Sequence, residues 1–296
     1  MSVLTSAEAV AAPPAVIRGR PGWARRLART TNGRIGLVVL CLLAVASVVA
    51  ATGVLPHSPA AQHPDQALQP PSGTYWLGTD QYGRDLFARV LAGLQLSLQI
   101  SVVAVLISTL VGGLAGIGAG FVRGWLEAVV LRCTDILFAV PSVLFALAIV
   151  TALGHGWLNS AIAVGIVYVP IFVRVVRGPV LALREADFIL AGRGLGFSTW
   201  RLLGGHVLPN VAGVVIVQVT LALAWAFLTE ASLSFLGLGP PAPSASLGKM
   251  VGDATSLAAG AWWTLAGPAV TIVLAVIGLN LLGDALRDAF DPSSGT

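Results

Sequence analysis

The chain has 296 residues, of which 56% are hydrophobic and only 10% are charged, and its formal net charge is +4. Soluble domains are about 45–50% apolar and about 25% charged, so this chain has too few charged residues to cover a globule in water. Its basic residues are sorted by position and are not interleaved with aromatic side chains, which argues against a nucleic-acid surface. The apolar residues come in long blocks, which indicates that membrane lipid is the solvent.

Six apolar blocks have the roughly 20 residues that a bilayer-crossing helix needs. They cover residues 35–54, 96–121, 129–153, 158–176, 211–233 and 265–286. Strands of a membrane barrel would be only about 9–11 residues long and alternate in polarity. The sequence therefore predicts an all-α, polytopic integral membrane protein of about six transmembrane helices. The first block is longer than the usual apolar core of a signal peptide, which favours an uncleaved helix.

The basic residues predict the orientation of these helices. With the N-terminus in the cytosol, only Arg84, Arg89 and Lys249 of the 17 Lys and Arg residues fall outside. By the positive-inside rule, both termini are expected to be cytosolic. We expect a cytosolic tail over residues 1–33, a transmembrane domain over 34–290 and a cytosolic C-terminal tail over 291–296.

A long outer loop is expected over residues 55–95, and its first part is rich in proline, which disfavours helix. Asp80, Arg84 and Asp85 are candidate docking residues there, and a solvated connector is the alternative. After Asp85, an amphipathic stretch predicts a short helix at the outer interface, with Asp85 and Arg89 as an i, i+4 ion pair.

A second long connection, on the cytosolic side, covers residues 177–209. It predicts two short helices that are broken near Gly194, with Ser198 as N-cap of the second and Pro209 opening the fifth span. Apolar side chains that face the cytosol between charged residues favour a docking surface, and a membrane-lying elbow is the alternative. The apolar side chains expected to be exposed on this surface are Leu195, Phe197, Trp200 and Leu203.

Two acidic residues lie inside or near the ends of spans. Asp135 follows Arg132 by three residues, which favours a structural ion pair between them. Glu230 lies near the outer end of the fifth span with no basic residue nearby in sequence, so it either lines a pathway or contacts a partner subunit. After it, Gly and Pro break the helix over residues 234–263, which suits a gate but also an ordinary helix end. The candidate pathway or gate residues are Glu230, Ser232, Ser234 and Phe235.

Residues 190–209 resemble the cytosolic coupling motif of ABC-importer permeases. Gly196 falls on the motif glycine and Pro209 on its last position, whereas Leu190, Gly192 and His206 depart from the pattern. The resemblance implies a segment that couples the chain to partner ATPases. Its residues are Leu190, Ala191, Gly192, Gly196, Phe197, Trp200, Arg201, Leu208 and Pro209.

A narrower resemblance, over about residues 33–292, is to the second permease subunit of dipeptide, oligopeptide and nickel importers. It is carried by residues 76–80 with 83–85, and by residues 135–142, 230–239 and 280–288. The resemblance implies a type I ABC-importer-like transmembrane domain in the bacterial cytoplasmic (inner) membrane. It also implies a machine in which this permease has three kinds of partner: a homologous second permease, two cytosolic ATPases and an extracytoplasmic binding protein.

The chain lacks the Gly-x-x-x-x-Gly-Lys-[Ser/Thr] motif, so ATP and Mg²⁺ are expected to be bound by the partner ATPases and no cofactor by this chain. Its four His and two Cys form no ligand pair, and no Gly-x-Ser-x-Gly motif occurs, so we expect a transport subunit and not an enzyme. A stand-alone secondary transporter would require ion-coupling groups in mid-membrane and internal repeats. Scattered His and Met favour peptides over nickel as cargo, and haem stays open.

Overall fold

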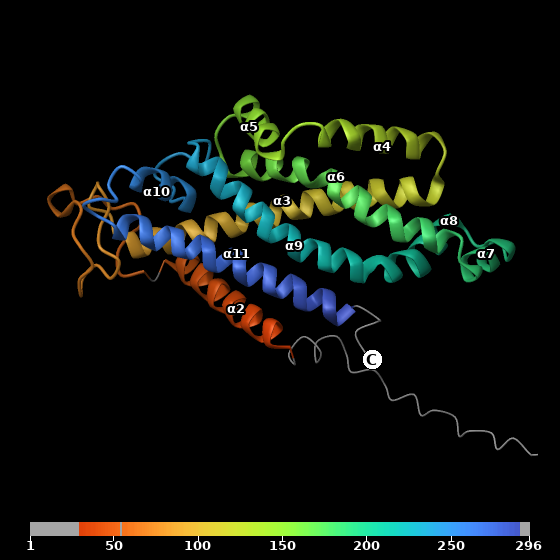
Figure 1. Ribbon diagram of the computed structural model, residues 1–296, viewed down its shortest axis with the longest axis horizontal. Coiled ribbons are helices and arrows are strands. Elements are labelled where there is room, and N and C mark those ends of the chain that lie inside the picture. Colours follow the sequence, from red (N-terminus) through yellow and green to blue (C-terminus); the bar gives the residue numbers. More distant parts are fainter. Residues whose placement is uncertain (1–29, 54, 291–296) are drawn as a thin grey trace, which may run out of the picture.

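The computed structural model describes residues 30–53 and 55–290, so most of the expected N-terminal tail and the expected tail over 291–296 lie outside the described residues. All regular structure in this part is helical (Figure 1). The elements are α2 (Thr31–Thr52), η1 (Pro64–Gln66), α3 (Leu86–Val122), α4 (Trp125–Phe138), α5 (Ser142–Leu153), α6 (Trp157–Arg184), α7 (Asp187–Gly194), α8 (Thr199–Leu202), the π-helical segment η2 (Leu203–Val207), α9 (Leu208–Phe235), α10 (Leu247–Ala254) and α11 (Trp263–Phe290).

The prediction of about six membrane-spanning helices is confirmed, with a change in the third. Within the described residues, five helices are long and apolar enough to cross a bilayer, and six if α4 and α5 together form one span. These two helices meet at an angle of 93°. The span expected over 129–153 is therefore broken at Pro141, which lacks a backbone N–H and restricts the residue before it.

The long helices run along one axis of the molecule, and its two ends differ (Figure 1). One end carries residues 55–85 together with α10, and we call these residues the cap. The other end carries the segment 185–207, with α7, α8 and η2, and we call it the elbow. Helix α5 lies across the direction of the bundle, between the two ends (Figure 1).

The most extensive helix contact joins α3 and α6, and glycines on α3 make it close. A Cβ atom on Gly112 would lie 2.5 Å from the Val169 carbonyl oxygen, and one on Gly116 would lie 2.7 Å from that of Val173. Small residues at an i, i+4 spacing let two helix backbones approach in the membrane. The glycine-rich second block therefore forms a close seam with α6.

Helix α3 begins ten residues before the block that predicted it, so the outer loop ends at residue 85 and not at 95. The expected interfacial helix after Asp85 is the first part of α3. Its apolar side chains Leu86, Val90 and Leu94 are buried with residues of α9, α10 and α11. A continuous buried helix replaces the separate surface helix because α10 covers this stretch.

Candidate functional site

The elbow consists of the two short helices that the sequence predicted. Helix α7 ends at Gly194, and Gly196 takes a left-handed conformation with φ of 77°, which glycine adopts at little cost. The Ser198 hydroxyl then accepts a hydrogen bond from the Arg201 N–H at 3.4 Å, as an N-cap of α8. The break near Gly194 and the Ser198 N-cap are confirmed. Pro209 does not open a separate helix, because α8 continues through the π-helical η2 into α9 without a break.

One face of the elbow is anchored in the bundle by a buried apolar cluster. Ile189, Leu202 and Val207 pack there with Phe121 of α3 and Val211 of α9, among others. All five side chains are at most 6% exposed. The elbow therefore shares one buried apolar core with the ends of three long helices.

The other face of the elbow exposes apolar side chains. Trp200 is 83% exposed and Leu195 is 76% exposed, which agrees with the predicted docking surface. Phe197 and Leu203 were also expected there, but both are half-buried against the anchoring cluster. The Arg201 guanidinium lies over the Phe197 ring, 5.3 Å from its centroid, and so covers part of it.

The remaining residues of the expected coupling segment divide between the two faces. Gly192 is buried, and a Cβ atom there would lie 2.8 Å from a side-chain carbon of Leu202. Leu190, Ala191 and Leu208 are exposed. The departure from the coupling motif at Gly192 thus has a local reason, since α8 packs directly on it.

The cap holds the residues that were expected to dock a partner, but their side chains point inward. The Asp80 carboxylate accepts from Arg84 Nε at 2.7 Å and lies 3.4 Å from Arg89 Nε. It also accepts from the backbone N–H groups of Tyr82 and Arg84. The side chains of Asp80, Arg84 and Asp85 are only 13%, 11% and 4% exposed. These three side chains fold the loop onto itself, and docking of a partner at this loop stays a prediction.

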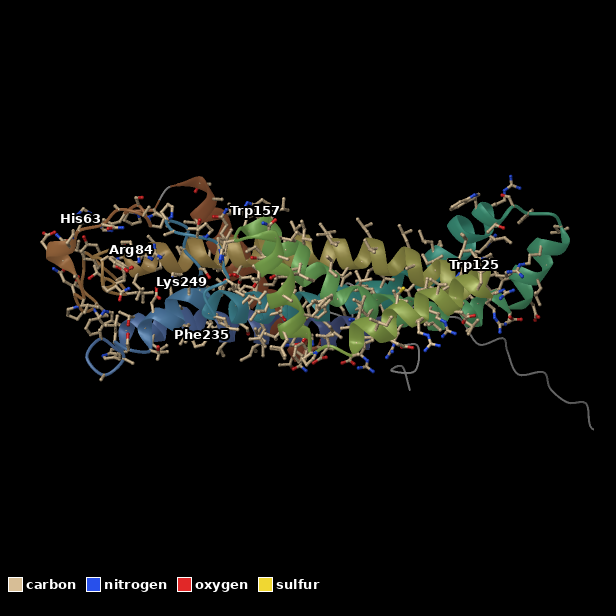
Figure 2. The ribbon with its side chains drawn as sticks, turned by 90° about the horizontal axis from the view of Figure 1, so that it is seen from above. His63, Arg84, Trp125, Trp157, Phe235 and Lys249 are labelled. Atoms are coloured by element: carbon tan, nitrogen blue, oxygen red, sulfur yellow. The ribbon has the colours of Figure 1, made fainter. Side chains whose placement is uncertain are left out.

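Asp85 joins the cap to α3. Its carboxylate caps the helix by accepting from the N–H groups of Phe87 and Ala88, and His57 Nδ1 lies 2.8 Å from its other oxygen. The expected Asp85–Arg89 pair is not formed, since Arg89 donates to the Pro59 carbonyl and faces Asp80. Figure 2 labels His63, Arg84 and Lys249 at this end of the molecule.

The predicted gate residues lie where α9 passes under α10. Glu230 and Ser234 are each 1% exposed, and the Ser234 hydroxyl donates to Glu230 Oε1 at 2.7 Å. The second carboxylate oxygen, Oε2, has no hydrogen-bond partner among the described residues, although Ser97 of α3 faces the carboxylate. Both side chains are inside the subunit, whereas a pathway or a partner contact requires a surface. Phe235 is exposed and Ser232 half-buried.

Helix α10, which covers this site, was missed by the sequence interpretation. Its signals were an N-cap serine, Ser246, and the apolar residues Leu247, Met250 and Ala254 on one face. The helix packs so closely on α9 that a Cβ atom on Gly248 would lie 2.0 Å from the Ala231 carbonyl oxygen.

Asp135 forms an ion pair, but its partner is not Arg132. Arg174 of α6 donates from Nη2 to Asp135 Oδ1 at 2.7 Å, which joins α6 to the end of α4. The i, i+3 partner was wrong because a tertiary contact competes for the carboxylate. Nearer the elbow, Arg177 forms a second ion pair with Glu127 between the same helices.

A groove of about 780 Å³ opens beside α9, and no sequence pattern singled it out. It is lined by Val175, Pro209, Asn210, Gly213, Val214, Val217, Gln218, Leu221, Arg287 and Phe290. Most of this lining is apolar, with amides from Asn210 and Gln218 and one cation from Arg287. Gln218, a polar residue in an apolar block, was the signal that could have indicated a water-facing side of α9.

Metal binding finds no support in the mapped structure, since residues 30–53 and 55–290 contain no group of three or more His, Cys, Asp or Glu that could hold an ion.

Comparison with known proteins gives consistent matches. The family described as "Binding-protein-dependent transport system inner membrane component" matches residues 108–295.

Relatives match over nearly the whole chain. The chain is 40% identical to the dipeptide transport system permease protein DppC of Alkalihalophilus pseudofirmus, over 90% of this chain and 88% of that protein. It is 41% identical to the di/tripeptide transport system permease protein DppC of Pseudomonas aeruginosa, over 88% of each chain. It is 37% identical to the glutathione transport system permease protein GsiD of Pectobacterium atrosepticum, over 92% of this chain and 90% of that protein.

Proposed function

Because this chain belongs to the family of binding-protein-dependent transport system inner membrane components, and is a C-type permease subunit of an ABC importer, we propose that its cargo is a short peptide. The observation that carries the proposal is 37–41% identity, over most of the chain, to permeases named for dipeptides, di/tripeptides and glutathione. These cargoes share a small size, amide bonds and charged groups at both ends.

The groove beside α9 supports this cargo class. Its volume of about 780 Å³ is within the range of small-molecule sites, and its amide and guanidinium groups can hydrogen-bond a peptide backbone or carboxylate. In this proposal the groove is half of the translocation pathway, and a homologous second permease provides the other half.

The two ends of the molecule support an orientation in which the cap is outside and the elbow is in the cytosol. Most Lys and Arg side chains in the described part of the chain lie toward the elbow end, as the positive-inside rule requires of a cytosolic face. An extracytoplasmic binding protein would then deliver cargo at the cap, and two ATPases would bind the exposed face of the elbow. The anchoring cluster supports this mechanism, because it connects the elbow to α3, α6 and α9.

Transport by the reconstituted complex tests the cargo. The chain is co-expressed with its neighbouring permease, ATPase and binding-protein subunits, and the complex is placed in proteoliposomes with ATP inside or outside as the orientation requires. We expect ATP-dependent uptake of labelled di- and tripeptides. Nickel ions, haem and free amino acids serve as the comparison cargoes.

Two outcomes would contradict the proposal. Uptake of nickel or haem at a higher specificity than any peptide would assign a different cargo within the same family. Uptake by the purified chain alone, without ATPase subunits, would assign a different mechanism and favour a secondary transporter.

A further inference from the structure

Arginines gather where α3 and α6 end and α4 begins. Arg123 Nε lies 3.8 Å from a carboxylate oxygen of Glu127, and Arg177 donates two hydrogen bonds to the other oxygen. Arg123 Nη1 also lies 3.7 Å from Glu185 Oε1. Arg184, the last residue of α6, is close enough to Glu127 to act on its carboxylate electrostatically. These three arginines, the arginine cluster, face only two glutamates and keep an excess of positive charge.

Within the arginine cluster, Arg184 differs from the other two in its hydrogen bonds. Its Nε and Nη1 atoms are buried and have no hydrogen-bond partner among the described residues. In the same part of the chain its guanidinium forms no ion pair, whereas Arg123 and Arg177 both do. Buried N–H groups on a charged side chain nearly always have an acceptor, because leaving them unpaired is costly. The acceptor for Arg184 is therefore expected to come from outside this chain.

The length of α6 places the arginine cluster at the edge of the membrane. The helix begins at Trp157 and ends at Arg184, and its 28 residues extend over about 42 Å at a rise of about 1.5 Å per residue. A bilayer with its headgroup regions is about 40–45 Å thick. Trp157 and Trp125 lie apart along the molecule, with Trp125 toward the elbow (Figure 2), and tryptophans are enriched at both membrane interfaces. Arg184 is then at the headgroup level of the elbow end.

The surface that continues from the arginine cluster toward the middle of the membrane is apolar. Val122 at the end of α3, and Trp125 and Val129 on α4, are all exposed. A lipid whose phosphate contacts the arginines could lay its acyl chains along these side chains. A soluble anion would use the charge of the cluster but not this apolar surface. Charge and apolar surface together therefore favour a lipid.

We propose that Arg123, Arg177 and Arg184 bind the phosphate group of an anionic phospholipid at the elbow end of the membrane. A guanidinium group can donate two parallel hydrogen bonds to phosphate oxygens, which gives Arg184 the acceptors that it lacks. The bound lipid joins the ends of α3, α4 and α6. The elbow meets the same place, because the Arg193 guanidinium of α7 lies over the Phe121 ring of α3, 5.0 Å from its centroid.

Lipid binding to the purified complex of this chain with its partner subunits tests the inference. The complex is stripped of lipid in detergent and titrated, and bound lipids are counted by native mass spectrometry. Phosphatidylglycerol has a net negative charge, phosphatidylcholine has the same phosphate without net charge, and glycerol 1-phosphate has no acyl chains. We expect phosphatidylglycerol to bind about fivefold or more tightly than phosphatidylcholine, and glycerol 1-phosphate to bind more weakly than either lipid.

A substitution of Arg184 links this binding to the arginine cluster. Arg184→Gln should weaken the binding of one phosphatidylglycerol per complex by about fivefold, because each basic side chain at the membrane surface contributes about that factor. Arg132→Gln is the matched control, since Arg132 is exposed on α4 and forms no hydrogen bond or ion pair within the described part of the chain. It removes the same charge and should leave the binding unchanged.

Three outcomes would overturn the inference. Equal affinity of the wild type and Arg184→Gln for phosphatidylglycerol would show that the arginine cluster does not bind it. Equal binding of the two lipids by the wild type would remove the role of charge. Binding of glycerol 1-phosphate as tight as that of phosphatidylglycerol would assign the cluster to a soluble anion.

Photo-crosslinking in the wild-type complex keeps the test independent of any variant that fails to fold. A phosphatidylglycerol with a diazirine in its acyl chain should label residues 118–130, where the apolar surface lies, and excess unmodified phosphatidylglycerol should compete. Labelling that is confined to other segments would contradict the proposed site. None of these measurements depends on the cargo, so failure of the peptide proposal would leave this inference standing.

Discussion

Asp80 is the residue on which the fold of the cap depends most. It is the only acceptor recorded in the described residues for Arg84 Nε, it faces Arg89, and it accepts two backbone N–H groups. Asp80→Asn removes the charge that both guanidinium groups face. We expect a loss of about 2–3 kcal/mol in cap stability, since a hydrogen bond to a charged group is worth about that much. Faster protease cleavage within residues 55–85, and a lower melting temperature, would measure it.

Asp65→Asn is the matched control for this prediction. Asp65 is exposed in the same loop, within η1, and it forms no ion pair in the described part of the chain. The substitution changes the charge of the cap equally but leaves the Asp80 contacts in place. Equal cleavage rates for both variants would show that the cap does not depend on the Asp80 network.

The cap also shows the limit of sequence reasoning at this scale. The residues Asp80, Arg84 and Asp85 stood out correctly, but charged side chains in an outer loop are expected to face solvent. Nothing in the order of residues indicates that Asp80 would collect two arginines, one of them from α3. The same holds for Asp135, whose partner Arg174 is distant in sequence.

Among the elements, the seam between α3 and α6 predicts that alanine substitutions at two nearby glycines of α3 change the stability in opposite directions. A Cβ atom on Gly116 would lie 2.7 Å from the Val173 carbonyl oxygen, whereas one on Gly113 would have no atom within 4 Å. Gly113→Ala should stabilise the protein by about 0.5–1 kcal/mol, because alanine favours the helix interior. Gly116→Ala should destabilise it, because the two helix backbones must separate.

Melting temperatures of the two variants in the same detergent measure this difference. The comparison is internal, since both substitutions add one methyl group to the same helix. A stabilised Gly116→Ala variant would contradict the close packing of α3 on α6.

The elbow gives a prediction about coupling. Trp200 is 83% exposed in this chain. We expect an ATPase to bury it, because tryptophans that become buried in protein interfaces often contribute much of the binding energy. Trp200→Ala should cost about 2 kcal/mol of ATPase-binding free energy and so weaken co-purification of the ATPases. ATP-driven uptake should then fall by roughly tenfold or more. The permease should still insert in the membrane, because Trp200 makes little contact within its own chain.

Trp125→Ala is the control for this effect. Trp125 is 76% exposed at the start of α4, toward the elbow end of the molecule (Figure 2), but it is outside the elbow itself. Its loss removes a similar exposed ring and should leave ATPase binding unchanged. An equal effect of both substitutions would show that the elbow surface has no special role.

The elements themselves were predictable where one physical signal dominated. Long apolar blocks located five spans, and Ser198 and Gly196 located the break in the elbow. The bend between α4 and α5 was not predicted, although Pro141 was visible, because a proline inside a span often only kinks it. Helix α10 was missed because it is only eight residues long and lies in a stretch read as a loop, although its apolar residues share one face.

At the scale of the whole molecule, the chain has a different chemistry at each end. The cap is a folded loop closed by internal ion pairs, whereas the elbow presents unpaired apolar side chains beside arginines. In the proposed importer, the cap would receive cargo and the elbow would receive work from the ATPases, so the two ends would meet different partners. The long helices that share cores with both ends provide the physical connection between them.

The orientation of these ends in the membrane is testable by labelling single cysteines in intact cells. The native Cys41 and Cys133 are both exposed and are first replaced by serine. Ala60→Cys then marks the cap and Leu195→Cys marks the elbow, and both positions are exposed. Because most Lys and Arg residues lie toward the elbow, we expect a membrane-impermeant maleimide to label position 60 in intact cells. Position 195 should react only after the membrane is opened, and the reverse pattern would place the elbow outside, where no ATPase could reach it.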